Sequence, residues 1–587
     1  MNRTPMPTWN LGDICSPVDR QALSTIFATI DKDVTTFEQH RKNLTEDITS
    51  EQVIAIIKES EAISLLLHTP AYYLHLKLTE DTAAHDINAL NTTIDQFAAD
   101  ISNRMLFFSL WWKQLDEKNA ERILKGLGKY THMMKDSRKF AKHTLTEPEE
   151  KIINIKDITG AGSMNTIYDI MTNAYQFDFN GKTNLTQAQV MEYVKNKDPT
   201  LRKTAYETVY AQYKKDENVL GELYKNIVLD WTNEGLKLRH YDSPIGMRNL
   251  GNDLPDKAIT ALLETCQKNI GIFHEYFTLK ATILKMKKLQ RYDVYAPLTG
   301  TEKTITYDES CNTVLNVFKG FDEEFHTMAK RMMDEQHIHS ELQKGKQSGA
   351  FCSSSIPNMT PYVLLNFVGK ERDVSTMAHE LGHAIHAMLS SHHHIFDYHA
   401  PLPICETASI FCEMLLEEHL LANTKSKDEK IHHLATQIDG VYASIIRQTY
   451  FTLFEQQAHD MIQNGATTPE LNNAWLANLK EQFGDSVDVP DLFQHEWKYI
   501  PHIFHSPFYC YSYAFGNLLV LSLYNKYKQE GNDFIPKYKK ILAYGGSQSP
   551  VDILKEVDID ITQTYFWQGG FDYIQTLVDQ LKKELGA

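Results

Sequence analysis

Apolar residues recur at helical spacing through the first quarter of the chain. Between residues 17 and 147 they return every three or four positions, and glycine and proline are rare. Three bulky clusters stand out there: Leu65–Leu67, Tyr72–Tyr73 and Leu106–Trp112. Because side chains at this spacing fall on one face of a helix, we expect these clusters to fill the core between packed helices.

Two short segments depart from the helical pattern. Tyr175–Phe179 and Lys182–Leu185 flank Asn180-Gly181, a pair that favours a type I′ turn, and together they predict a β-hairpin. Pro361–Phe367 is apolar and aromatic, and its leading proline suits an edge strand. An edge strand could hold an extended peptide through backbone hydrogen bonds. A strand buried in the core is the equal alternative.

Helical spacing resumes after the hairpin. A series begins at Thr186 and a second start follows at Asp198-Pro199, with tyrosines at 206, 210 and 213 that we expect to be core. A chain of 587 residues exceeds one ordinary core, so we expect at least two lobes. A weakly marked boundary between lobes lies near residues 190–200, and it divides the chain into 1–195 and 196–587.

Composition and charge exclude several classes of partner. The net charge of −17 argues against nucleic acid and anionic membranes as partners. The sequence has no N-terminal signal pattern and no apolar run of about 18 residues, so we expect a cytoplasmic protein. Its seven cysteines are scattered without a Cys-x-x-Cys pair, as expected for free thiols in a reducing compartment. No obligate protein partner is evident.

The strongest chemical signal is His379-Glu380-Leu-Gly-His383. In a helix, His379 and His383 stand one turn apart on the same face, where two imidazoles can bind one Zn²⁺. Glu380 lies beside them and can take a proton from water as a general base. The alternative is a surface helix with two ordinary histidines, so a third ligand decides between these interpretations.

The segment around this motif should be helical. Asp373 or Ser375 can cap its start, and alanine, methionine and leucine fill its interior. Gly382 costs about 1 kcal/mol relative to alanine in a helix. We therefore expect another part of the chain to pack tightly against the backbone at Gly382.

A third ligand is available downstream. Ile404–Glu417 has a helical pattern in which Glu406 and Glu413 share a face with apolar neighbours. A carboxylate on an apolar segment needs a partner, and zinc is a suitable one for Glu406. Glu413 could then orient a ligand histidine by a hydrogen bond.

Two other stretches could suggest ligand chemistry. Gly345–Cys352 is a glycine-spaced polar turn, but it lacks the ending of a phosphate-binding loop. His392–His394 and His399 lie among serine, aspartate and proline. We expect this histidine run to be a solvated loop rather than a metal site.

The last informative stretch is Ile500–Gly516. Its tyrosines at every second position predict one face of a strand, or an aromatic wall along a groove, or simple aromatic packing. Tyrosine O–H and histidine N–H groups are the neutral donors that stabilise a developing oxyanion. The candidates are His502, His505, Tyr509, Tyr511 and Tyr513.

These motifs, in this order, resemble the M3 family of zinc metallopeptidases, and specifically its oligoendopeptidase F branch. The resemblance rests on Gly345–Cys352, Pro361–Phe367, the His379 helix, Glu406–Glu413, and Ile500–His502 with Phe508–Tyr513. Weaker likeness extends outward to Tyr292–Leu298, Tyr544–Ser547 and Phe566-Trp567, and the first hundred residues match only vaguely.

The resemblance implies a mainly α fold. It implies an elongated two-lobed helical body split by a deep substrate channel, with a small β-sheet beside the zinc helix and thermolysin-like active-site helices. The 1–195 segment would be an N-terminal helical lobe, and 196–587 the M3-type catalytic region. Such a channel admits short unstructured peptides and excludes folded proteins.

The resemblance also assigns roles. His379, His383 and Glu406 would bind one Zn²⁺ per chain, Glu380 would be the base, and Glu413 would support a ligand. His502 would contact the transition state. Because the spacing from this histidine to the tyrosines is one residue longer than in the family pattern, His505 is the alternative. Tyr509 and Tyr511 are the favoured donors among the tyrosines. The peptide-binding candidates are Gly349, Tyr362, Leu364, His505 and Tyr513.

The expected function is hydrolysis of internal bonds in short unstructured oligopeptides by a zinc metalloendopeptidase. A zinc carboxypeptidase or dipeptidase with the same ligands is the nearest alternative. Glu380-x-x-His383 with Glu323-x-x-His326 also fits a di-iron carboxylate enzyme. A non-catalytic peptide-binding protein is a further alternative, although binding alone needs no general base such as Glu380.

Overall fold

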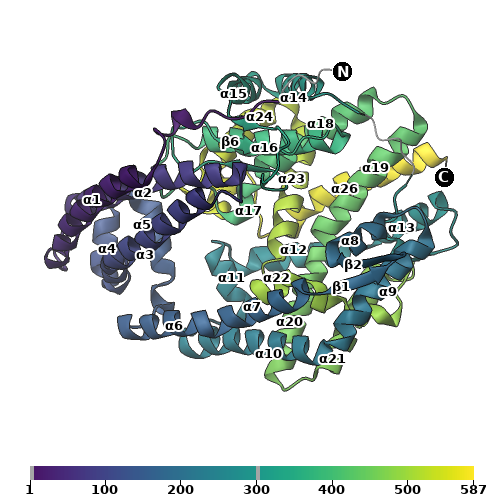
Figure 1. Ribbon diagram of the computed structural model, residues 1–587, viewed down its shortest axis with the longest axis horizontal. Coiled ribbons are helices and arrows are strands. Elements are labelled where there is room, and N and C mark those ends of the chain that lie inside the picture. Colours follow the sequence, from purple (N-terminus) through teal and green to yellow (C-terminus); the bar gives the residue numbers. More distant parts are fainter. Residues whose placement is uncertain (1–5, 299–303, 587) are drawn as a thin grey trace. The chain divides into compact units, whose positions relative to one another are not determined.

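The computed structural model describes residues 6–298 and 304–586 (Figure 1). Their contacts group into two compact units. Unit 1 comprises the described parts of Met1–Ala141, Glu302–Ala422 and Tyr527–Asp558. Unit 2 comprises those of Lys142–Thr301, Asn423–Lys526 and Ile559–Ala587. Most of the described chain is helical, which confirms the predicted mainly α class. The predicted division at residue 195 and the channel between lobes stay predictions.

Unit 1 begins with the predicted helical bundle. Its helices are α1 (Arg20–Phe37), α2 (Ser50–Glu80), α3 (His85–Gln114), α4 (Glu117–Leu124) and α5 (Thr131–Lys139). The first three pack side by side, as Figure 1 shows in purple and blue. Trp112 is buried in the core of this bundle, and Tyr72 and Tyr73 lie in a second core cluster next to it. The expected packing role is confirmed for these aromatic residues, whereas Leu66 and Leu106 of the predicted core clusters are exposed.

The rest of unit 1 surrounds one central helix, α16 (Glu371–Leu389). The helices α14, α15 and α24 pack directly against it. The remaining helices of the unit are α14 (Tyr307–Phe321), α15 (Glu323–Asp334), α17 (Leu402–Cys405), α18 (Thr407–Asn423, whose last residue falls in unit 2), α24 (Ile535–Ala543) and α25 (Pro550–Lys555).

A three-stranded sheet lies against α16, as the fold class predicts (Figure 1). Its strands are β4 (Ile338–His339), β5 (Phe351–Ser353) and β6 (Tyr362–Leu364), in the order β4-β6-β5. The β6 strand runs parallel to β4 and antiparallel to β5. It is therefore the central strand, and the edge-strand interpretation of Pro361–Phe367 is wrong. The strand next to α16 with a free edge is β5.

Unit 2 contains the predicted hairpin. The strands β1 (Gln176–Phe179) and β2 (Lys182–Thr186) pair antiparallel. Asn180 and Gly181 have φ values of 50° and 73°, as a type I′ turn requires. A second, parallel pair joins β3 (Leu289–Gln290) to β7 (Val487–Asp488).

The helices of unit 2 bury the expected tyrosines. Residues 206, 210 and 213 lie on α9 and are all buried. The helices are α6 (Glu147–Thr159), α7 (Ala161–Asn173), α8 (Gln187–Met191), α9 (Pro199–Lys215), α10 (Glu217–Thr232), α11 (Pro244–Gly251), α12 (Asp256–Lys268), α13 (Gly271–Ile283), α19 (Lys427–Val441), α20 (Arg447–Gln463), α21 (Thr468–Phe483), α22 (Pro501–His505), α23 (Tyr511–Glu530, whose end lies in unit 1) and α26 (Thr564–Leu585).

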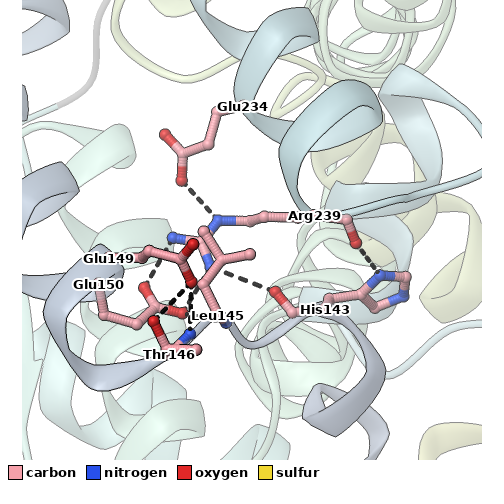
Figure 2. Close-up of polar contacts among 7 residues, drawn as sticks. All are labelled: His143, Leu145, Thr146, Glu149, Glu150, Glu234 and Arg239. Atoms are coloured by element: carbon pink, nitrogen blue, oxygen red, sulfur yellow. Dashed lines mark hydrogen bonds and ion pairs between the residues drawn. The ribbon is translucent and has the colours of Figure 1, made fainter.

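An arginine ties two of these helices together within unit 2 (Figure 2). Arg239 donates through Nη1 and Nη2 to the two oxygens of Glu150 on α6, each at 2.8 Å. Its Nε donates to Glu234 at 2.6 Å, and its carbonyl accepts from His143 Nδ1 at 2.7 Å. Such bidentate pairing fixes direction as well as distance. It joins the start of α6 to the π-helical turn Asn233–Leu238 that follows α10.

In the part of the chain that the structure describes, no helix is both long and apolar enough to cross a membrane. The seven cysteines are all free, as their scattered positions predict.

Candidate functional site

The helix α16 starts earlier than its sequence suggests. Glu371 is its first residue, and the carboxylate of Asp373 accepts the backbone N–H groups of residues 368–370 at 2.8–2.9 Å. Asp373 thus supports the helix start from inside the first turn. Ser375 lies within the helix and donates to Glu417 at 2.8 Å, so its predicted capping role is wrong.

Close packing at Gly382 brings two helices together. A Cβ on Gly382 would lie 2.6 Å from Ser409 Cα and 2.7 Å from the Ala408 carbonyl oxygen, both on α18. Only glycine allows this approach, because backbone atoms cannot move aside. The tight contact expected at Gly382 is confirmed. Its effect is to place Glu406, just before α18, beside the histidines of α16.

The three predicted metal ligands converge on one point. The Nε2 atoms of His379 and His383 lie 3.4 Å and 3.3 Å from the same oxygen, Oε2 of Glu406. One ligand atom from each residue lies within 4.8 Å of the others. Ser409 donates to Glu406 Oε2 at 2.7 Å and thereby holds the carboxylate in place. Two imidazoles and one carboxylate are a donor set that fits zinc and leaves a fourth position open.

Glu413 orients the first of these histidines. It contacts His379 Nδ1 from α18, and because a carboxylate accepts there, Nδ1 carries a proton and Nε2 is turned toward the ligand group. Although burial disfavours a charged ring, the hydrogen bond and charge of Glu413 raise the pKa of His379 to about 9. Burial likewise opposes ionisation of Glu406, yet its hydrogen bond with His383 and the nearby histidines lower its pKa to about 2. The carboxylates therefore favour positive charge at this place.

Glu380 faces a cavity next to the ligand group. The cavity has a volume of about 530 Å³, and Glu380, His379, His383 and Glu406 line it together. The Glu380 side chain is nearly buried, and this burial raises its pKa, although His379 and His383 oppose the shift. A raised pKa makes a carboxylate a stronger proton acceptor, as a general base requires.

One wall of the cavity is the strand β5. Residues 350–355 line it, along with Tyr398 and His399. Gly349 directly precedes this wall and has a φ of 82°. Tyr362 and Leu364, by contrast, are fully buried in β6, so their side chains cannot contact a peptide and that assignment does not hold.

The remaining candidates lie in unit 2. His502 on α22 sits between two tyrosines: Tyr509 stacks on it with ring centroids 6.3 Å apart, and Tyr513 meets it edge-on at 5.7 Å. The segment is helix–loop–helix, so the strand interpretation of the alternating tyrosines is wrong.

Two other candidates in this segment have different surroundings. Tyr511 is fully buried, and its hydroxyl oxygen accepts a hydrogen bond from Asn252 at 2.8 Å. This burial contradicts the prediction that Tyr511 donates to a substrate. His505 pairs with Asp169 at 2.8 Å. His502, Tyr509 and Tyr513 therefore form the group that the structure brings together.

Among the described residues, one other group could hold a metal ion. Asp157, Asp230 and Glu234 approach one another in unit 2. Their oxygen-only donors suit Ca²⁺ or Mg²⁺ better than zinc, and Glu234 already accepts from Arg239.

The di-iron alternative lacks a second site. His326 Nδ1 donates to the Leu315 carbonyl at 3.0 Å, and Glu323 lies 3.9 Å from Lys319. Neither Glu323 nor His326 belongs to a group of described residues that could bind a metal. The di-iron interpretation of the two Glu-x-x-His motifs is therefore not supported.

Sequence reasoning missed several residues of the site. Ser409 could have been found, because it follows Glu406 by three residues in a helical pattern. Tyr398 and His399 could not have been found, because the sequence of their loop is typical of a solvent-exposed loop. His394 in the same histidine run is also buried, 3.1 Å from Asp397, so the expected solvation of this run is only partly correct.

Comparison with known proteins adds independent information. The sequence model described as Peptidase family M3 matches residues 192–573, and the one described as Oligopeptidase F matches residues 111–177. The chain is 30% identical to an oligoendopeptidase F homolog of Borreliella burgdorferi over 88% of both sequences. It is 24% identical to the oligopeptidase PepF of Bacillus subtilis, covering 98% of this chain and 87% of that protein.

Solved structures share the fold. A crystal structure of a Chlamydophila abortus protein matches with a TM-score of 0.88 at 25% identity, covering 98% of both chains. The crystal structure of oligoendopeptidase-F from Enterococcus faecium matches with a TM-score of 0.72 at 20% identity, covering 97% of this chain and all of the other.

Proposed function

Because this chain belongs to peptidase family M3 and is similar to oligoendopeptidase F over nearly its whole length, we propose that it is a zinc-dependent endopeptidase acting on short unstructured peptides. The observation that carries the proposal is the convergence of His379, His383 and Glu406 beside Glu380 in one cavity. The proposed stoichiometry is one zinc ion per chain.

The ligand chemistry supports zinc. His379, His383 and Glu406 would hold the ion, with Glu413 and Ser409 fixing two of these ligands. A zinc ion in such a site supplies a Lewis acid that polarises a peptide carbonyl and acidifies water.

Glu380 carries the proton transfers in this proposal. Its carboxylate takes a proton from the attacking water and passes it to the amine of the leaving peptide. Burial raises the pKa of Glu380 and so increases the affinity of its carboxylate for the proton that it accepts from water.

The free edge of β5 is the proposed peptide-binding strand. Val363 and Leu365 of the β6 segment donate to the carbonyls of residues 337 and 339, so these two residues face β4. Backbone groups alternate along a strand, so Leu364 and its partner Phe351 face each other across the β5–β6 ladder. Cys352 between the paired residues therefore turns its N–H and C=O toward the free edge, where an extended peptide can bind.

We also assign His502 and Tyr509 as oxyanion donors in this proposal. The support is the sequence resemblance together with the stacking of the two rings. Removing one such donor lowers kcat by about 10²–10³-fold in other enzymes. Tyr513, at 3.3 Å from His502 Nε2, replaces Tyr511 as the second tyrosine of the group.

Internal cleavage is favoured over terminal cleavage. Among the described residues that line the cavity there is no lysine or arginine. A carboxypeptidase benefits from such a cation, because it must bind the terminal carboxylate of its substrate. The cytoplasmic location and the absence of a protein partner stay predictions.

The proposal is tested by removing and restoring metal. Zinc-free protein should not cleave an internally quenched peptide, and one equivalent of zinc should restore cleavage. Glu380→Gln should bind zinc with unchanged affinity and lose turnover, because the amide cannot accept the proton. Full activity of the zinc-free protein, or of a zinc-loaded Glu380→Gln variant, would contradict the proposal.

A further inference from the structure

The loop that leads into β5 is fastened to the end of β6. Asn366, two residues after the end of β6, donates through Nδ2 to the carbonyl oxygen of Gly349 at 2.7 Å and to that of Gln347 at 2.9 Å. Lys346 in the same loop donates to three carbonyl oxygens, those of residues 339, 341 and 365, at 2.6–3.2 Å. The loop is thus held by five hydrogen bonds from two side chains to backbone oxygens.

The hydrogen bond to Gly349 determines where the next N–H points. A trans peptide is planar, so the Gly349 oxygen and the Ala350 hydrogen lie on opposite sides of the chain. Asn366 binds the oxygen from the β6 side, and the Ala350 N–H therefore points away from β6. Alternation along the strand gives the same result independently, because Phe351 faces β6 and its neighbours face the free edge.

We propose that Asn366 is a positioning residue for substrate: it turns the Ala350 N–H toward the free edge of β5, where that N–H donates to a carbonyl oxygen of the bound peptide. This inference rests on the proposed function. Ala350 and Cys352 then supply two successive rungs of a ladder with the peptide, two residues apart as strand pairing requires. Ala350 lines the cavity with the metal ligands, so the rung lies in the same cavity as the ligand group.

The backbone at Gly349 has a conformation that favours glycine. Gly349 has a φ of 82°, in the left-handed region, and nothing lies within 4 Å of the place where its Cβ would be. Glycine is thus needed at this position for its backbone angle and not for space. Strand pairing begins only at Phe351, so the hydrogen bond from Asn366 adds a restraint on the Gly349–Ala350 peptide plane, at a residue whose backbone angles are the least restricted.

The test uses a variant of the same size. Asn366→Asp replaces the donating amide with a carboxylate oxygen, which repels the Gly349 carbonyl and releases the peptide plane. Ser348→Ala, at an exposed position in the same loop, is the matched control. We expect Asn366→Asp to raise KM roughly 3- to 10-fold, as expected for one hydrogen bond, with kcat within about 2-fold. Ser348→Ala should leave both unchanged.

A second measurement separates this inference from the proposed function. Peptide binding to the Glu380→Gln protein, measured by calorimetry, requires no cleavage, and adding Asn366→Asp should weaken it by the same factor. Unchanged peptide affinity in the folded, zinc-loaded double variant would overturn the role of Asn366, even if the wild type cleaves peptides. Weakened affinity in a protein whose wild type cleaves nothing would support Asn366 and contradict the proposed reaction. No peptide binding to Glu380→Gln would overturn both.

Discussion

At the scale of single residues, two metal-ligand side chains are each held by a hydrogen bond with a residue of α18. Glu413 holds His379 by Nδ1, and Ser409 holds Glu406 by Oε2. Neither supporting residue is among the metal-binding group, yet both decide where its lone pairs point. The sequence indicates Glu413 because a carboxylate in an apolar helix needs a partner, and it indicates Ser409 only through its position three residues after Glu406 in a helical pattern.

Glu413→Gln should weaken zinc binding by about 10–100-fold, because the neutral amide no longer stabilises a polarised His379 ring. Competition with a fluorescent chelator measures the affinity. Circular dichroism should show that the variant keeps the helix content of the wild type. An unchanged zinc affinity would show that Glu413 packs beside His379 without affecting how His379 binds the metal.

A second residue, Glu455, lies fully buried on α20 and accepts the Phe508 N–H at 2.7 Å. Burial raises its pKa to about 8 from 4.5, against the opposing Phe508 N–H and Arg248. The native protein therefore keeps this proton up to about pH 8, whereas the unfolded chain releases it near 4.5. The contribution of Glu455 to stability is present below pH 4.5 and is lost as the pH rises toward 8.

Glu455→Gln removes this titration and keeps an oxygen for the Phe508 N–H. We expect the variant to gain stability relative to the wild type as the pH rises from 5 to 8, by several kcal/mol, since one pKa unit corresponds to about 1.4 kcal/mol. Urea denaturation at both pH values measures the difference. A gap between the two proteins that does not change with pH would contradict the buried, protonated state of Glu455.

At the scale of elements, the contact between α16 and α18 and the order of three short strands define the site. The helix was predictable from its spacing, and the close contact from a glycine in an otherwise strong helix. The position of Pro361–Phe367 in its sheet was not predictable, because an apolar strand that begins with proline can pair on one side or on both. Its partners, β4 and β5, are two and three residues long and carry no pattern of their own.

Gly382→Ala tests the helix contact. The added Cβ would lie within 2.9 Å of three backbone atoms of α18, so we expect a loss of about 2 kcal/mol or more, despite the better helix propensity of alanine. Gly440→Ala on α19 is the control, because nothing lies within 4 Å of its Cβ position. That substitution should stabilise by about 0.5–1 kcal/mol.

Thermal denaturation of the two alanine variants measures the contrast. Zinc affinity should fall with Gly382→Ala, since displacing α18 moves Glu406, and should stay constant with Gly440→Ala. Equal stability of the two variants would mean that α16 and α18 adapt to the extra methyl group.

At the scale of the whole molecule, the sequence predicts a mainly helical chain with at least two lobes. The described residues group into two compact units. Their composition was not predictable, because each unit joins stretches that lie hundreds of residues apart. Residue spacing reports on neighbours within a helix or strand, whereas such long-range grouping depends on which apolar faces meet. For the same reason, the spacing of the tyrosines could not separate buried Tyr511 from Tyr509 and Tyr513.

The central claim is that zinc, Glu380 and a peptide-binding edge make this chain an endopeptidase for short peptides. Its most direct test is mass spectrometry of a mixture of unstructured peptides, about 5 to 30 residues long, incubated with the zinc-loaded protein. Parallel samples contain a zinc chelator or the Glu380→Gln variant. The account predicts cuts at internal bonds of the shorter peptides, absent from both parallel samples. Stepwise loss of terminal residues, or no cleavage by fully zinc-loaded protein, would contradict it.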